Sequence, residues 1–274
     1  EPGTAPTEPG DFDAGSRSDV TESEEAVGPP PGVAAAPPEP ARRIQVPESW
    51  WQGVEVLIED PNGAMTAFYR ALARTGLKEE GGTTRISHWG DSAIAADSMT
   101  SAARRILQSH FGDGGRGMVL VESGSDWYRQ KDVRWKRRGW KTRKIINKGS
   151  EKDGRYGLGG TSAHGRRGAT ATYGTVDDGP VGQAVGAYEL YFSQSPGAGE
   201  LSFTLDGEPH STLSTHGETT ADAVHRIEVS DGAHELMMRV TKGRVRAFGM
   251  AMERAVPGVV YDCFGLVGAR GSRM

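Results

Sequence analysis

Thr84-Arg85-Ile86-Ser87-His88-Trp89-Gly90-Asp91-Ser92 is the stretch that decides the fold, because it joins a short strand directly to a tight turn that carries a serine. Residues 98–111 follow as a predicted helix, since apolar residues recur there at helical spacing. A residue at the carboxyl end of a strand in an open α/β sheet stands where ligands bind. We therefore expect an α/β unit in this part of the chain, with Ser92 as a candidate nucleophile. The apolar side expected of the helix consists of Met99, Ala103, Ile106, Leu107 and Phe111.

A serine hydroxyl is a poor nucleophile until a base takes its proton and nearby donors stabilise the oxyanion that forms. Gly90 permits a tight backbone path before Ser92, but a Gly-Asp turn is also common in a chain with 39 glycines. His88 is not the expected base, because residues four apart in a strand stand roughly 13 Å apart. The tripeptide alone therefore leaves a structural turn and a catalytic turn both open.

Composition limits how much of the chain folds. Residues 1–47 are rich in Pro, Gly, Ala, Ser and acids, so they are expected to form a disordered linker, with an acidic binding tail as the alternative. The net charge of −4 is concentrated there, and the remainder is slightly basic.

Cys263 is the only cysteine, which excludes an internal disulfide and a cysteine metal cluster. The sequence contains no signal peptide or membrane-spanning run, although it begins with Glu, so a targeting segment could have been removed.

The segment from Trp127 to Lys148 is strongly basic and contains four aromatic residues. One interpretation is a solvated, charged segment with tryptophans packed beneath it. A second is contact with a glycan or envelope polymer, in which Trp135 and Trp140 would stack on sugars and Arg138 would bind the polymer. A third is nucleic-acid binding. The sequence leaves all three open.

The sequence pattern beyond Gly160 is typical of an all-β unit. Apolar residues alternate along short stretches such as 188–192 and 201–205, and Asp206-Gly207 is a strong hairpin signal. A second turn is expected at Asp231-Gly232. Short strands at this spacing predict a β-sandwich or jelly roll rather than a further βα unit.

Two blocks of the chain resemble bacterial SGNH hydrolases, the GDSL-type serine esterases. The first block comprises Arg85 to Ser92, Arg104-Arg105-Ile106-Leu107 and Phe111 to Gly117. The second is Val259 to Arg270, where Gly268 matches a glycine that donates its backbone NH to the oxyanion hole, although Val267 replaces the usual Asn. The most similar group has a carbohydrate-binding-like module inserted between these blocks, and peptidoglycan O-acetylesterases are its best-understood members. The segments 138–141 and 156–160 look like the joins of that module.

The resemblance implies a domain organisation and a fold. Residues 1–47 would be the linker, 48–124 the first part of the SGNH domain, 125–254 the inserted β module and 255–274 the second block. The fold would be a partial, flavodoxin-like three-layer α/β domain with an inserted all-β jelly roll or sandwich. The family's third block and its final Asp-x-x-His have no counterpart in the chain.

The resemblance also implies a function. Ser92 would be the nucleophile, Asp91 its neighbour in the block, and Gly268 an oxyanion donor, with no cofactor or metal. The expected substrate is an acyl ester of polysaccharide or peptidoglycan outside the cytoplasm, in the periplasm or at the cell surface, where the linker could serve as an envelope tether or follow a lipid anchor. Because the catalytic histidine is missing, the chain alone is expected to be inactive or weak. The alternatives are a non-catalytic glycan-binding or envelope scaffold protein and, less favoured, a nucleic-acid-binding protein, although no nucleic acid is the expected partner.

Overall fold

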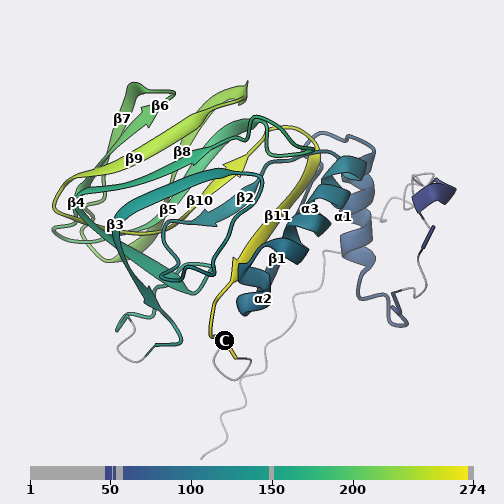
Figure 1. Ribbon diagram of the computed structural model, residues 1–274, viewed down its shortest axis with the longest axis horizontal. Helices are drawn as coiled ribbons and strands as arrows, with labels where there is room; N and C mark the ends of the chain where they lie inside the picture. The colour runs from purple at the N-terminus through teal and green to yellow at the C-terminus, as the bar shows by residue number, and fades with distance from the viewer. Residues whose placement is uncertain (1–46, 51, 54–57, 148–150, 271–274) are drawn as a thin grey trace, which may run out of the picture. The chain divides into compact units, whose positions relative to one another are not determined.

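The computed structural model describes residues 47–50, 52–53, 58–147 and 151–270 (Figure 1). These residues belong to one compact unit, Arg42–Met274, whereas the predicted linker lies almost wholly outside the described residues. No helix in the described part is long and apolar enough to cross a membrane. The helices are η1 (Glu48–Trp50), α1 (Thr66–Gly76), α2 (Ser92–Ala95) and α3 (Ser98–Phe111).

Strands make up most of the regular structure. The first five are β1 (Thr83–Gly90), β2 (Gly117–Leu120), β3 (Arg134–Lys144), β4 (Thr161–Gly174) and β5 (Val185–Gln194). The remaining six in the described part are β6 (Glu200–Leu205), β7 (Glu208–Ser214), β8 (Ala221–Gly232), β9 (Glu235–Lys242), β10 (Arg244–Glu253) and β11 (Gly258–Gly265).

A small α/β part is built on two parallel strands. β1 pairs with β11 from Thr83↔Gly258 to Gly90↔Gly265, so strands more than 160 residues apart end at the same edge. The helices α1, α2 and α3 lie together beside this pair (Figure 1). β11 is buried along its whole length, whereas β1 is only partly covered. The turns that follow the two strands are therefore neighbours.

The nine other strands form one curled sheet. Its order is β7-β6-β9-β4-β10-β5-β8, with β3 added on β4 and β2 on β10. The long strand β4 bonds to β10 through residues 163–166 and to β9 through residues 170–174, and this change of partner lets the sheet curl. The enclosed core contains apolar residues from most of these strands, with Tyr173, Leu201, Leu236 and Met238 all fully buried. The predicted all-β unit is confirmed.

The structure confirms some of the helices and turns predicted from the sequence and shifts others. The helix over residues 98–111 and the Asp206-Gly207 hairpin between β6 and β7 are confirmed. The second turn was placed slightly too early, because β8 continues to Gly232 and the chain turns at residues 233–234. β2 lies within the predicted 48–124 segment, yet it bonds to β10 of the predicted module.

The predicted three-layer α/β fold is only partly represented. Two parallel strands with helices beside them are present, but nine of the eleven described strands belong to the curled sheet, so the described protein is mainly β. A parallel sheet normally has more strands and both faces covered. The structure therefore shows the β1–α2–α3 unit and its pairing with β11, but not a flavodoxin-like core.

Candidate active site

Ser92 is the first residue of α2 and stands two residues beyond the end of β1. Asp91 caps the helix, since its Oδ1 accepts a hydrogen bond from the Ala93 amide at 2.9 Å. The first NH groups of a helix have no partner within the helix, so the Ser92 amide is free to bind an oxyanion. Asp91 and Ser92 are both exposed. The predicted strand–turn–helix geometry is thus present, with the hydroxyl accessible.

Two glycines allow α2 to pack directly on the strand ends. A Cβ at Gly265 would overlap the backbone nitrogen of Ala95, and one at Gly90 would overlap the Ile94 side chain. These two glycines are partners in the β1–β11 register. The close contact fixes α2 over the point where both strands end.

The turn after β11 brings Gly268 to the same edge. The Leu266 amide donates to the Gly90 carbonyl at 2.8 Å, and the Ala269 amide donates to the Leu266 carbonyl at 2.9 Å. Gly268 has φ of +90°, a conformation that favours glycine, and it is exposed. The structure therefore brings the chain around Ser92 and Gly268 together, as the resemblance implied. Their catalytic roles stay predictions.

A buried ionic cluster holds the carboxyl end of α2. Asp97 follows α2 in the left-handed conformation, with φ of 51°. Its carboxylate accepts hydrogen bonds from Arg104 at 2.9 Å, Arg116 at 3.1 Å, Thr100 at 2.5 Å and the Lys131 amide at 2.8 Å. Burial acts to raise the pKa of Asp97, but the Arg116 and Arg104 guanidiniums outweigh it and hold the pKa below its usual range.

The segment before β3 completes this support. The Arg129 amide donates to the Ala95 carbonyl at 2.9 Å, directly at the end of α2. Asp132 receives Arg104 at 2.9 Å and Arg105 at 2.6 Å. Since α2 has only four residues, these contacts rather than its own hydrogen bonds keep it in place.

The predicted apolar side of α3 is only partly right, because Ala103, Leu107 and Phe111 are half-buried but the other two residues are not. Met99 is 61% exposed and Ile106 is 59% exposed, whereas the buried residues are polar. Carboxylates neutralise Arg104, and Gln108 donates to the carbonyls of Gly115 and Val259 at 2.8 Å each. The regular 3–4 spacing of the polar residues in the sequence is the signal that sequence reasoning missed. These buried residues are Thr100, Ser101, Arg104 and Gln108.

Neither sequence candidate for a nearby base or second nucleophile contacts Ser92. His88 is half-buried, and its Nδ1 lies 2.9 Å from the Tyr261 hydroxyl. Cys263 is buried with its Sγ 3.1 Å from the Ile94 carbonyl oxygen, and burial raises the pKa of its thiol, so the thiol stays protonated. Among the described residues, no hydrogen bond joins the Ser92 hydroxyl to a histidine or carboxylate. The same residues include no cluster of His, Cys, Asp or Glu that could hold a metal.

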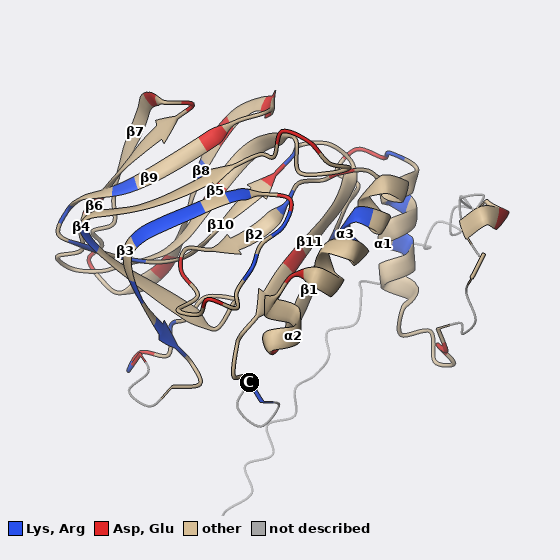
Figure 2. Ribbon diagram, in the orientation of Figure 1, with Lys and Arg blue, Asp and Glu red and all other residues tan. Residues whose placement is uncertain are grey.

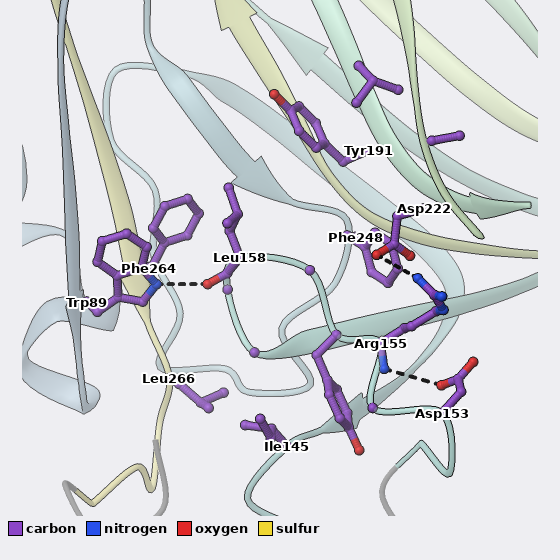
Figure 3. A pocket seen from close by; sticks show the side chains of 17 residues that line it. Trp89, Ile145, Asp153, Arg155, Leu158, Tyr191, Asp222, Phe248, Phe264 and Leu266 are labelled. Atoms are coloured by element: carbon purple, nitrogen blue, oxygen red, sulfur yellow. Dashed lines mark hydrogen bonds and ion pairs between the residues drawn. The ribbon is translucent and has the colours of Figure 1, made fainter. Parts of the chain in front are cut away.

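A cavity of about 1030 Å³ lies beside the strand ends (Figure 3). Trp89 stacks on Phe264, with ring centroids 5.2 Å apart, and its Nε1 donates to the Leu158 carbonyl at 2.8 Å. Across the cavity, β5, β8 and β10 contribute side chains, and Asp222 of β8 forms an ion pair of 3.0 Å with Arg155 of the loop between β3 and β4. Sequence reasoning missed this cavity, because its walls come from segments far apart in the chain. The labelled lining residues in Figure 3 are Trp89, Ile145, Asp153, Arg155, Leu158, Tyr191, Asp222, Phe248, Phe264 and Leu266.

The three residues predicted to bind substrate lie on β3, outside this cavity. Trp140 is buried over Gly165, and its Nε1 donates to the Thr170 carbonyl at 2.9 Å. Trp135 packs against Tyr128 under the sheet, while Arg138 is exposed. The structure does not bring this set to Ser92. The substrate-binding role stays a prediction, and the burial of Trp140 argues against sugar stacking there.

Comparison with solved structures gives a match that establishes a fold. No family model and no curated protein matches the chain. A solved structure of a peptidoglycan O-acetylesterase, described as "in action, 5 min", matches with a TM-score of 0.54 and 24% sequence identity. The match covers 73% of this chain and 51% of that chain. The two chains share a fold over these parts. This chain therefore spans about half the length of the esterase structure.

Two other structural matches have lower TM-scores. A two-domain esterase active on acetylated mannans has a TM-score of 0.34 at 12% identity, covering 52% of this chain and 38% of its own. The C-terminal CBM6 of a laminarinase from Zobellia galactanivorans has a TM-score of 0.28 at 13% identity, covering 50% of this chain and 99% of its own. Scores at this level do not establish a shared fold.

Proposed function

We propose that this chain carries the nucleophile and the oxyanion donors of an SGNH-type serine esterase that removes O-acetyl or other acyl groups from a bacterial wall or surface polysaccharide. The observation that carries the proposal is the β1–β11 register. It pairs Gly90 with Gly265 and so directs the Ser92 turn and the Gly268 turn to one edge. The fold shared with part of a peptidoglycan O-acetylesterase structure supports it.

The proposed chemistry is acyl transfer through a covalent intermediate. The Ser92 oxygen attacks the acyl carbon of the sugar ester while its proton passes to a base. The amides of Ser92 and Gly268 stabilise the negative charge on the tetrahedral oxygen. When the tetrahedral intermediate collapses, the bond between the acyl carbon and the sugar oxygen breaks. The sugar oxygen takes the proton from the base and leaves as a hydroxyl. Water then attacks the acyl-Ser92 ester, releasing a carboxylic acid and restoring the serine.

The base is the part of this mechanism that the described residues do not supply. His88 is bonded to Tyr261, so we propose that a histidine oriented by an aspartate comes from a downstream segment or a partner chain. The buried cluster around Asp97 fixes α2, the helix that begins with the proposed nucleophile Ser92. The chain alone would then act only through its oxyanion donors and would be weak.

The proposed place of action is outside the cytoplasm, because wall and surface polysaccharides lie there. The Pro-rich, acidic sequence of residues 1–47 suits a tether between an envelope anchor and the folded unit. We propose this arrangement from composition alone.

Hydrolysis of p-nitrophenyl acetate tests the role of Ser92. We expect the 274-residue chain to hydrolyse the ester slowly but faster than buffer, because oxyanion donors alone give measurable catalysis when triad members are missing. Ser92→Ala should remove that excess. Ser98→Ala is the matched control, because Ser98 is also an exposed first residue of a helix. A rate unchanged in Ser92→Ala would reject Ser92 as nucleophile.

A non-catalytic polysaccharide-binding protein is the second candidate. It is favoured by the exposed cations of β3, which have no role in the esterase chemistry. Release of acetate from an O-acetylated wall polysaccharide, compared with binding to the same polymer, separates the two candidates. The proposed segment with the histidine is added in both measurements. If the chain binds the polymer but releases no acetate that depends on Ser92, the polysaccharide-binding candidate is favoured.

A further inference from the structure

The basic segment recognised in the sequence forms a strand with its cations turned outward. β3 contains no Asp or Glu, and neither does its partner β4. Trp135 and Trp140 turn toward the core, while Lys136, Arg138 and Lys141 are exposed on the other side of the sheet. Figure 2 shows this run of blue along β3. The aromatic and basic residues that the sequence interleaves are therefore separated onto opposite faces.

Neighbouring strands extend the same outward face. Arg138 pairs with Thr170 of β4, and Thr170 pairs with Arg239 of β9, so the two arginines flank one threonine. Arg166 of β4 pairs directly with Arg244 of β10. Partners in antiparallel strands project to the same side and lie about 5 Å apart. We call the exposed set Lys136, Arg138, Lys141, Arg166, Arg239 and Arg244 the cationic strip.

The charges of the cationic strip are not neutralised within the described protein. None of its six members forms an ion pair or a side-chain hydrogen bond with a described residue. Other cations nearby do have partners: Arg143 contacts Glu151 at 3.1 Å, and Arg137 contacts Glu122 at 2.8 Å. Like charges this close repel one another. An external anion would relieve that repulsion.

A cavity of about 320 Å³ lies at one end of the strip. Arg244 lines it together with the hydroxyl-bearing residues Ser193 and Ser195. The two other basic residues in its wall already have partners, Arg246 in Asp153 at 2.7 Å and His164 in Glu151. One unpaired guanidinium beside hydroxyl donors suits a single carboxylate, since a guanidinium binds a carboxylate through two parallel hydrogen bonds. The Asp153 carboxylate also lines the cavity, and it would repel a doubly charged phosphate more strongly than a singly charged carboxylate.

We propose that the cationic strip binds an anionic polysaccharide that carries carboxylates, with one sugar carboxylate anchored by Arg244 in this cavity. From Lys136 to Lys141 the strip follows β3 for about 17 Å, a length that engages several sugars. A nucleic acid is disfavoured, because bases need exposed aromatic faces and the tryptophans of β3 turn inward. This binding does not require Ser92, so it stands or falls separately from the esterase proposal.

Binding of the full chain to polygalacturonate tests the proposal. The matched neutral probe is the carboxyl-reduced form of the same polymer, and single-stranded DNA is the competing polyanion. Arg138→Glu and Arg244→Glu are compared with Arg70→Glu, an equally exposed arginine on α1 with the same change of charge. Circular dichroism and thermal unfolding check that each variant is folded.

The expected result is binding to polygalacturonate that weakens with salt and is at least tenfold tighter than binding to the reduced polymer. Arg138→Glu and Arg244→Glu should each weaken it by about tenfold or more, the order of one charge-assisted hydrogen bond, with Arg70→Glu within twofold of wild type. Competition by free glucuronic acid and by N-acetylmuramic acid distinguishes a uronic carboxylate from a lactyl carboxylate. Ser92→Ala should bind like wild type.

Three outcomes would overturn the inference. Equal binding of the reduced polymer would show that carboxylates are not recognised. An equal effect of Arg70→Glu would show that only net charge matters. Tighter binding of DNA, abolished by the same two substitutions, would assign the strip to nucleic acid.

Discussion

Replacing Asp97 by Asn changes one atom in the cluster that supports α2. The carboxylate receives both Arg104 and Arg116, and all three side chains are almost completely inaccessible to solvent. An asparagine has one acceptor oxygen, and its amide would direct donors at the guanidiniums. Arg104 keeps Asp132 as a partner, but Arg116 has no other carboxylate among the described residues. The variant therefore leaves a buried charge without compensation.

Removing one partner of a buried ion pair typically costs about 3–5 kcal/mol. We expect Asp97→Asn to fall in this range, because one guanidinium loses its only charged partner among the described residues. For a folded unit of this size, each kcal/mol lowers Tm by about 2–4 °C, so the expected fall is about 10 °C. Urea unfolding followed by circular dichroism gives the free energy of unfolding, and a thermal scan gives Tm.

Asp91→Asn is the control for this experiment. Asp91 is exposed, its side chain bonds only to the Ala93 amide within the described chain, and Asn caps a helix as well as Asp does, so the change should stay below about 0.5 kcal/mol. If the Tm of Asp97→Asn lies within about 2 °C of that of Asp91→Asn, the cluster does not support α2 as argued.

Three further predictions concern the pH dependence of stability, the packing of α2 on β11, and the buried tryptophan of β3. Acidification should destabilise the wild type as the pH falls below about 4, because the pKa of Asp97 is lower in the folded than in the unfolded chain, and the slope of stability against pH should be smaller in Asp97→Asn. Gly265→Ala should cost several kcal/mol in urea unfolding, because its Cβ would overlap the Ala95 backbone, whereas Gly232→Ala, with open space around it, should be close to neutral. Trp140→Ala should lower stability by about 3–5 kcal/mol and leave polygalacturonate binding of the folded fraction within twofold, the reverse of what a sugar-stacking tryptophan would do.

Local patterns in the sequence were enough to place the site-bearing unit. The run into Gly90-Asp91-Ser92 and the segment after it predicted a strand, a turn and the helix over residues 98–111 in the right order, but the short helix α2 was not predicted. The resemblance of residues 259–270 to a second block predicted that Gly268 would serve the same site as Ser92, a long-range relation that no local pattern could suggest. The structure shows the pairing of β1 with β11, while the role of Gly268 stays a prediction.

Features that depend on tertiary partners were beyond the sequence. The burial of Arg104 depends on Asp97 and Asp132, which only the fold brings beside it, so the polar buried residues of α3 were not predicted. The outward placement of Arg138 and the burial of Trp140 depend on the bulge at Gly139, where φ is +79° and the pairing with β4 shifts. The cavity near Trp89 likewise needed segments that only the fold brings together.

The central claim is that the edge where β1 and β11 end stabilises acyl transfer at position 92. The rate of acylation at position 92 can be measured without the missing base, because a thiol is partly ionised near neutral pH and needs no base to attack an ester. Ser92→Cys in a Cys263→Ala background, treated with p-nitrophenyl acetate, should accumulate a thioester seen as a burst of nitrophenol and a mass increase of one acetyl group. Ser98→Cys in the same background is the control, since it places an exposed thiol at the first position of α3.

We predict that the thiol of the Ser92→Cys variant is acylated at least tenfold faster than the thiol of the Ser98→Cys variant, because one oxyanion donor is worth about 10²–10³ in rate and the proposed site has two. The same advantage should fall when Gly268 is replaced by Ala, which cannot easily hold φ of +90°. Equal acylation of the two variants at equal thiolate content would contradict the claim that Ser92 and Gly268 form one site.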